Sequence, residues 1–82
     1  MEKTIYSSEY DAVVRLLRAA RKTARITQVE LAERLGLTQS LVSKMERGDR
    51  RLDIIEVRTM CRAIGISFPE FVNQLERKLS KR

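Results

Sequence analysis

The chain has 82 residues, enough for one small domain with a modest core but too few for two. Its 17 lysines and arginines outnumber 11 aspartates and glutamates, and the resulting charge of +6 favours phosphate-rich partners or anionic surfaces. One cysteine and no histidine exclude an internal disulfide and a metal cluster, so we expect no cofactor and no enzymatic activity.

Apolar residues recur at spacings of three and four along the chain, which predicts an all-α domain of five helices. The first helix is expected over residues 8–24. The second begins after Thr27, which can form a capping box with Glu30, and ends near Gly36. The expected buried side of the first helix comprises Tyr10, Val13, Val14, Leu17 and Ala20.

The middle of the chain carries two further pairs of start and stop signals. Thr38 caps a short third helix, and Gly48 supplies the left-handed turn that ends it. Asp53 and Glu56 cap a fourth helix, which ends before Gly65. The residues expected on its buried side are Ile54, Val57, Cys61 and Ile64. In that position Cys61 is interpreted as a small buried hydrophobe rather than a reactive thiol.

A fifth helix is predicted from the capping box of Ser67 and Glu70, with Pro69 in its first turn. Its apolar residues are Phe68, Phe71, Val72, Leu75 and Leu79. Residues 1–82 are therefore interpreted as one domain, with frayed ends over 1–7 and 80–82. The lone cysteine and an opening too polar and acidic for a signal peptide indicate a cytoplasmic protein. No apolar run approaches the roughly 18 residues needed to span a bilayer, so no membrane span is expected.

Only Gly36 and Leu37 join the second and third predicted helices, a turn typical of the helix-turn-helix, here at about 28–47. Ala32 is small where the two helices would cross. The residues expected to converge on a shared core are Leu31, Leu35, Leu37, Val42 and Met45. The exposed complement contains no acid and comprises Gln28, Gln39, Ser40, Ser43, Lys44 and Arg47. Such side chains can contact base edges and phosphates.

The segment TQVELAERLGLTQSLVSKMERGDRR resembles the Cro and phage-repressor type of helix-turn-helix, also called the xenobiotic-response-element (XRE) family. The family pattern is met at Thr27-Gln28, Leu31-Ala32, Gly36 and Ser43 to Gly48, and the likeness extends over about residues 10–75. The resemblance implies a compact lambda-repressor-like domain of a prokaryotic transcriptional regulator. Such proteins bind double-stranded DNA operators, usually as homodimers, and the expected role here is a repressor on a palindromic operator.

The resemblance also assigns roles to individual residues. It implies base-reading by Gln39, Ser40, Ser43 and Lys44, and phosphate binding by Gln28, Thr38, Arg47, Arg50 and Arg51. It further implies an ion pair between Arg21 and Glu46. Two positions depart from the family, since Arg25 stands where relatives end the first helix with glycine and Leu52 stands where many have proline. Arg25 is therefore expected either at positive φ or in a different turn.

The sequence leaves two questions open: which surface mediates dimerisation, and whether DNA or a protein is the main partner. The fifth helix carries an apolar stripe of Phe71, Leu75 and Leu79, which we interpret as the dimerisation surface. The alternative to a DNA-binding regulator is an antitoxin-like module that acts mainly through a protein partner such as a toxin. An acid-free reading face favours DNA. For the cations of the first helix, Arg15, Arg18 and Lys22, solubility is favoured over phosphate contact.

Overall fold

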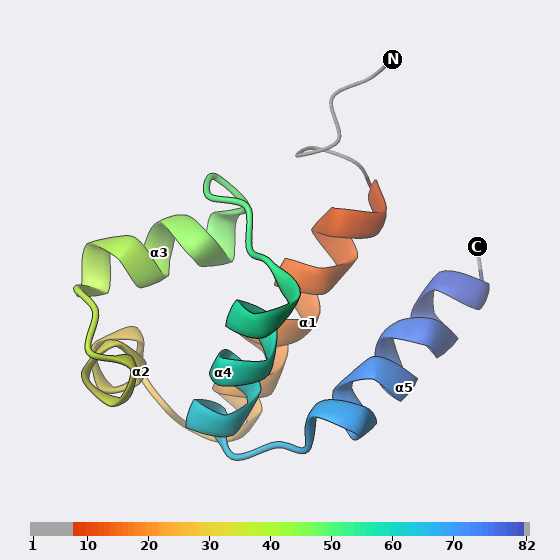
Figure 1. Cartoon of the computed structure of the whole chain (residues 1–82). Helices are drawn as coiled ribbons and strands as arrows, with labels where there is room; N and C mark the ends of the chain where they lie inside the picture. Colours follow the sequence, from red (N-terminus) through yellow and green to blue (C-terminus); the bar gives the residue numbers. More distant parts are fainter. Residues whose placement is uncertain (1–7, 82) are drawn as a thin grey trace.

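The computed structural model describes residues 8–81, and in this part of the chain the secondary structure consists of five α-helices (Figure 1). The bounds are Ser8–Thr23 for α1, Gln28–Leu35 for α2, Gln39–Arg47 for α3, Ile54–Ile64 for α4 and Phe68–Ser80 for α5. The expected all-α fold is confirmed. The end expected to fray at 80–82 is helical as far as Ser80, while residues 1–7 and 82 lie outside the described residues.

The helices are arranged around α1 and α4, which pack against each other near the middle of the molecule. Figure 1 shows α2 and α3 together on one side and α5 on the other. Helix α1 contacts α3 as well as α5, and α2 contacts α4. Because α3 rests on α1 and α2, the rest of the domain supports it as a rigid element.

Every helix contributes to a single core. The largest fully buried side chains are Leu17, Leu31, Val42, Cys61 and Phe71, one from each helix in chain order. Burying an aliphatic or aromatic side chain of this size stabilises a fold by about 1.5–3 kcal/mol relative to leaving it exposed. None of the five helices is therefore dispensable to the core.

Local hydrogen bonds at the helix starts explain most of the helix boundaries. The Thr27 hydroxyl accepts from Glu30 N at 3.0 Å, and the Glu30 carboxylate accepts from Thr27 N at 2.8 Å. The same reciprocal capping box forms between Asp53 and Glu56. At α5 the expected box is half formed, because Ser67 Oγ accepts from Glu70 N at 3.2 Å but the Glu70 carboxylate is used further along the helix.

The turn between α1 and α2 has a left-handed residue that is not glycine. Arg25 has φ 62°, and its amide donates to Lys22 O at 3.0 Å while Ile26 N donates to Arg21 O at 3.2 Å. These bonds satisfy carbonyls at the end of α1, as a C-terminal glycine does in other helices. The departure from the family at Arg25 therefore changes the residue and keeps the left-handed turn.

Two apolar residues expected on buried faces, Ile54 and Leu37, are exposed instead, and so is Val72 of the fifth helix. Ile54 is 68% exposed, Val72 42% and Leu37 37%. Ile54 and Val72 lie at the rim of a groove between α1, α4 and α5, where no further helix in the described part covers them. A domain of this size buries a smaller share of its apolar surface than a large one, which explains why the outer residues of each apolar stripe stay in contact with solvent.

Candidate nucleic-acid interface

The outer side of α3 is polar, while its inner side is apolar. Thr38 caps the helix, since its hydroxyl accepts from Leu41 N at 3.1 Å, and it holds the next residues at the exposed N-terminal end. Thr38, Gln39, Ser40, Lys44 and Arg47 are exposed and Ser43 is half-buried, whereas Val42 and Met45 are buried. The side chains expected to read bases therefore lie on one accessible face.

A buried ion pair joins this helix to α1. Arg21 Nε donates to Glu46 Oε2 at 2.6 Å, Arg21 Nη2 donates to Glu46 Oε1 at 3.0 Å, and Arg21 Nη1 donates to Ile26 O at 2.7 Å. The two side chains are only 8% and 2% exposed. A bidentate pair of this kind fixes both position and orientation. The contact implied by the family resemblance is thus present, and it sets how α3 sits on the domain.

Two glutamines extend this pair to the surface. Gln28 Nε2 donates to Glu46 Oε1 at 3.0 Å, and Gln39 Nε2 donates to Gln28 Oε1 at 2.7 Å. Gln28 begins α2 and Gln39 begins α3, so the bonds also join the first turns of the two helices. We call this chain of four side chains, Arg21, Glu46, Gln28 and Gln39, the polar network. The angle between α2 and α3 brings the two glutamines, eleven positions apart, into contact.

Arg47, Arg50 and Arg51 differ in the contacts that their guanidinium groups make with other side chains. Arg47 donates to Ser43 Oγ at 2.7 Å and pairs with the exposed Asp49 at 2.9 Å. The Arg51 guanidinium lies over the Tyr10 ring, 4.8 Å from its centroid, in a cation–π contact. Both side chains are exposed, so an incoming phosphate can reach them.

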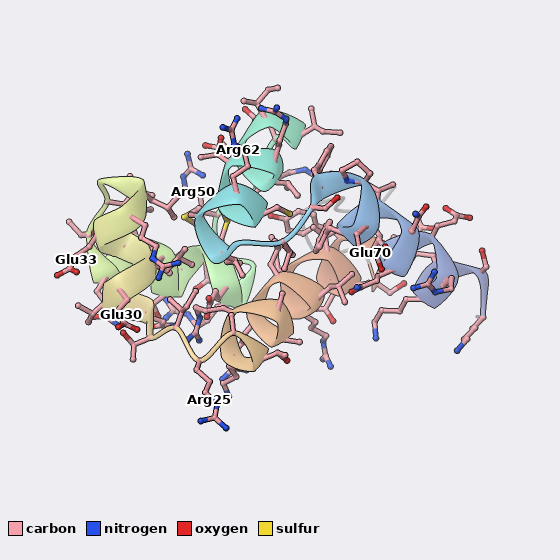
Figure 2. All side chains as sticks on the ribbon, turned by 90° about the horizontal axis from the view of Figure 1, so that it is seen from below. Arg25, Glu30, Glu33, Arg50, Arg62 and Glu70 are labelled. Carbon is pink, nitrogen blue, oxygen red and sulfur yellow. The ribbon has the colours of Figure 1, made fainter. Side chains whose placement is uncertain are left out.

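Arg50 is held differently. Its Nη2 donates to Glu56 Oε2 at 2.8 Å, and this hydrogen bond raises the pKa of Arg50 and lowers the pKa of Glu56. Within residues 8–81, Arg50 Nη1 is buried without a hydrogen-bond partner. Figure 2 shows Arg50 beside α4 and away from Glu30 in the first turn of α2. In this conformation Arg50 is oriented toward Glu56, which makes it the least available of the expected phosphate contacts.

The polar outer side of α3 and the buried ion pair behind it agree with the similarity of this chain to known proteins. Residues 17–71 match the helix-turn-helix family. The chain belongs to the XRE-type helix-turn-helix family of DNA-binding regulators. It is similar to the solved structure of an XRE-family like protein from Pseudomonas syringae pv. tomato str. DC3000, with 48% identity, 92% of each chain covered and a TM-score of 0.83. No curated protein matches.

For this XRE-family domain, the expected dimerisation residues need revision. Phe71 is 2% exposed and belongs to the core, so it offers almost no surface to a partner, and that part of the expectation is wrong. Leu75 and Leu79 are half-buried. Accessible apolar surface beside α5 lies around a groove of about 170 Å³, where Ile54, Phe68, Val72 and Leu75 meet. We call these four residues the α4–α5 patch.

Cys61 of this XRE-family domain is a free, buried cysteine. Burial raises the pKa of the Cys61 thiol to about 11, so the thiol stays protonated near neutral pH and packs in the core. Across the described residues, His, Cys, Asp and Glu side chains form no group that could hold a metal ion. No helix of residues 8–81 has both the length and the apolar character needed to cross a bilayer.

Proposed function

We propose that this protein is a sequence-specific transcriptional repressor that binds a palindromic operator as a homodimer. The observation that carries the proposal is the polar network, which fixes Gln39 and the first turn of α3 at the accessible end of the recognition helix. A side chain held in place before binding loses less conformational entropy when it meets a base. A glutamine amide matches the N6 and N7 atoms of adenine.

The remaining base contacts follow from the same face of α3. In the proposal Ser40 and Ser43 donate or accept at base edges near Gln39, and Lys44 reaches a guanine or a neighbouring phosphate one turn further along the helix. Gln28 and Thr38 lie at helix starts, where backbone amides and the helix dipole favour a phosphate. Arg47 and Arg51 supply cations beside the recognition helix, while Arg50 contributes only if it leaves Glu56.

The homodimer is supported by the α4–α5 patch. One small module buries too little DNA surface for tight binding, and two modules on one operator place their recognition helices about 34 Å apart or a near multiple. Exposed Ile54 and Val72 flank a groove that a second copy can fill with the same residues, as a two-fold interface requires. A dimer covering the operator would repress by excluding other proteins from it.

The test is a selection of bound duplexes from a random DNA pool, followed by sedimentation of the protein with and without the selected duplex. The proposal expects a palindromic consensus and two chains per duplex. Ile54→Ser should weaken dimerisation and operator binding while leaving the melting temperature nearly unchanged, because Ile54 is exposed. Recovery of no consensus from the pool would overturn the proposal.

A second candidate role uses the same patch for a different protein, in the manner of an antitoxin that binds a toxin. The exposed apolar residues Ile54 and Val72 favour it, because such surfaces mark interaction sites. The same sedimentation experiment separates the two roles. A chain that stays monomeric on and off its selected duplex would leave the patch to a different partner.

A further inference from the structure

A second basic surface lies outside the recognition helix. An open depression of about 350 Å³ lies along α1 where α5 packs against it, and its lining comprises Arg15, Leu16, Arg18, Ala19, Lys22 and Lys78. A neighbouring depression of about 320 Å³ shares Arg15 and Lys78 and continues toward Ser8 and Asp11. We call the two together the α1–α5 basic groove. Four cations line it against one acid, so an anionic occupant is favoured.

The cations of this groove are largely unneutralised. Asp11 pairs only with Arg15, at 2.6 Å, and both are exposed. Within residues 8–81, Lys22 and Lys78 form no ion pair, and Arg18 lies at the 4.0 Å limit from Glu46. Like charges that share a groove repel one another, and an incoming anion removes that cost. Solubility alone would be served equally well by cations scattered over the surface.

The groove is continuous with the proposed DNA interface. Arg18 Nε is 4.0 Å from Glu46 Oε1, and that same oxygen accepts the Gln28 amide at 3.0 Å. Figure 2 shows α1 and the first turn of α2 along the lower edge, near Arg25 and Glu30, and α4 with Arg62 at the opposite edge. Helix α1 therefore lies along the same edge of the molecule as the end of α2 that is proposed to bind a phosphate.

We propose that the α1–α5 basic groove binds the phosphate backbone of DNA flanking the operator. This inference rests on the proposed function and extends it beyond the recognition helix. Duplex DNA carries a negative charge every 1.7 Å or so of its axis, so the backbone presents a row of phosphates to a row of cations. Arg18 approaches the Glu46 oxygen that also accepts the Gln28 amide, and in the proposal Lys22 and Lys78 meet phosphates further from the operator centre.

The effect to be measured is the salt dependence of binding. Each phosphate contact adds about 0.9 to the slope of log affinity against log salt, which amounts to roughly a threefold larger loss of affinity between 50 and 200 mM salt. Lys78→Gln removes one groove cation, and glutamine has a helix propensity close to that of lysine. Arg62→Gln is the matched control, because Arg62 is also exposed but lies on α4 at the opposite edge (Figure 2).

The probe is a duplex selected from a random pool, synthesised in two lengths: the selected core alone, and the core with about ten further base pairs, one helical turn, at each end. The wild type should bind the long duplex with a slope larger than on the core. Two chains bind each duplex, so Lys22→Gln and Lys78→Gln should each remove one contact per chain, lower the long-duplex slope by about 1.8 and leave the core slope unchanged. Arg62→Gln should change neither.

Three outcomes would overturn the inference while leaving the proposed function intact: equal wild-type slopes on the two duplexes, equal slopes for Lys78→Gln and the wild type, or an equal loss with Arg62→Gln. The last would indicate a general effect of net charge. A wild type that binds neither duplex would contradict the proposed function itself. Circular dichroism of each variant verifies the fold, which the exposed positions of Lys22 and Lys78 should preserve.

Discussion

Two arginine–glutamate pairs with similar bond lengths lie in very different surroundings. Arg21 and Glu46 meet at 2.6 Å with side chains that are 8% and 2% exposed. Arg50 and Glu56 meet at 2.8 Å with half-buried side chains that are 40% and 33% exposed. We call Arg21 with Glu46 the buried pair and Arg50 with Glu56 the exposed pair. In water, solvent screens the charges and the two side chains lose entropy on pairing, so an exposed pair contributes little to stability. Burial, and not the bond length, decides what each pair contributes.

The two pairs also differ in what else they bind. Both Glu46 oxygens are used, one by Arg21 alone and the other by Arg21 and Gln28, and the second bond leads on to Gln39. Glu56 accepts from Arg50 and from the backbone of Asp53, which keeps it a local helix cap. The buried pair therefore positions the recognition surface, and the exposed pair closes a loop and starts α4. Substitutions in each pair should therefore have different effects on stability and on DNA binding.

The largest effect is expected from Glu46→Ala. It leaves the Arg21 guanidinium buried without its carboxylate, and breaking such a pair by removing one partner costs about 3–5 kcal/mol. Urea denaturation at pH 7 measures the loss, and the melting temperature should fall clearly with it. Replacing both charges, with Arg21→Met and Glu46→Leu together, should recover part of the stability because no buried charge is left unpaired. An unchanged melt for Glu46→Ala would mean that the pair contributes no more than an exposed one.

The next effect is expected on DNA binding, at the outer end of the polar network. Gln39→Ala should cost about 1–3 kcal/mol on the preferred operator and relax the preference at one base pair per half-site. Gln28→Ala should weaken binding to random DNA, since Gln28 is assigned to a phosphate, and should weaken binding to the preferred operator somewhat more, since Gln28 also holds Gln39.

Because Gln28 also holds Gln39, at 2.7 Å, the two substitutions should be non-additive. Residues in direct contact typically show coupling energies of 0.5–3 kcal/mol, which titrations of the two single variants and the double variant measure. Strictly additive losses would show that the network does not position Gln39 for reading.

A smaller effect is expected from breaking the exposed pair. Arg50→Gln removes the cation that pairs with Glu56 while leaving the capping bonds between Asp53 and Glu56, so stability should fall by no more than about 1 kcal/mol. Its effect on operator affinity should be smaller than that of Arg51→Gln, because Arg50 is oriented toward Glu56 and Arg51 is exposed. Binding and melting curves of the two variants decide this. A larger loss of affinity for Arg50→Gln would place Arg50 on a phosphate when DNA is bound.

The sequence predicts local features of this molecule well and non-local ones poorly. The starts of α2 and α4 follow from Thr27 with Glu30 and Asp53 with Glu56, because capping bonds join residues three apart. Exposure of Ile54 depends on which other helices cover the first turn of α4, and no local pattern contains that information.

Local features of the candidate site were likewise predicted from the sequence pattern, and contacts between distant residues were not. The polar face of α3 follows from its helical spacing, and the pairing of Arg21 with Glu46, 25 positions apart, came from the family resemblance. The bond between Gln28 and Gln39 requires the angle between α2 and α3, which only the folded chain supplies. The same is true of the α1–α5 basic groove, because Lys78 joins the cations of α1 only after α5 packs against α1.

The smallest effect is a pH dependence specific to the exposed pair. The hydrogen bond from Arg50, and secondarily that from the Asp53 amide, lowers the pKa of Glu56 in the folded state. A carboxyl group with a lowered pKa contributes stability that is fully present above its unfolded pKa, about 4.3, and is lost as pH falls through the folded value. The difference in unfolding free energy between the wild type and Glu56→Gln should therefore stay constant above about pH 5 and shrink in more acidic solution. Urea denaturation of both proteins from pH 7 to pH 2.5 or so measures it, at low salt because solvent ions screen an exposed pair. A difference that does not change over this range would show that Glu56 acts only through its capping bonds, which glutamine can also form.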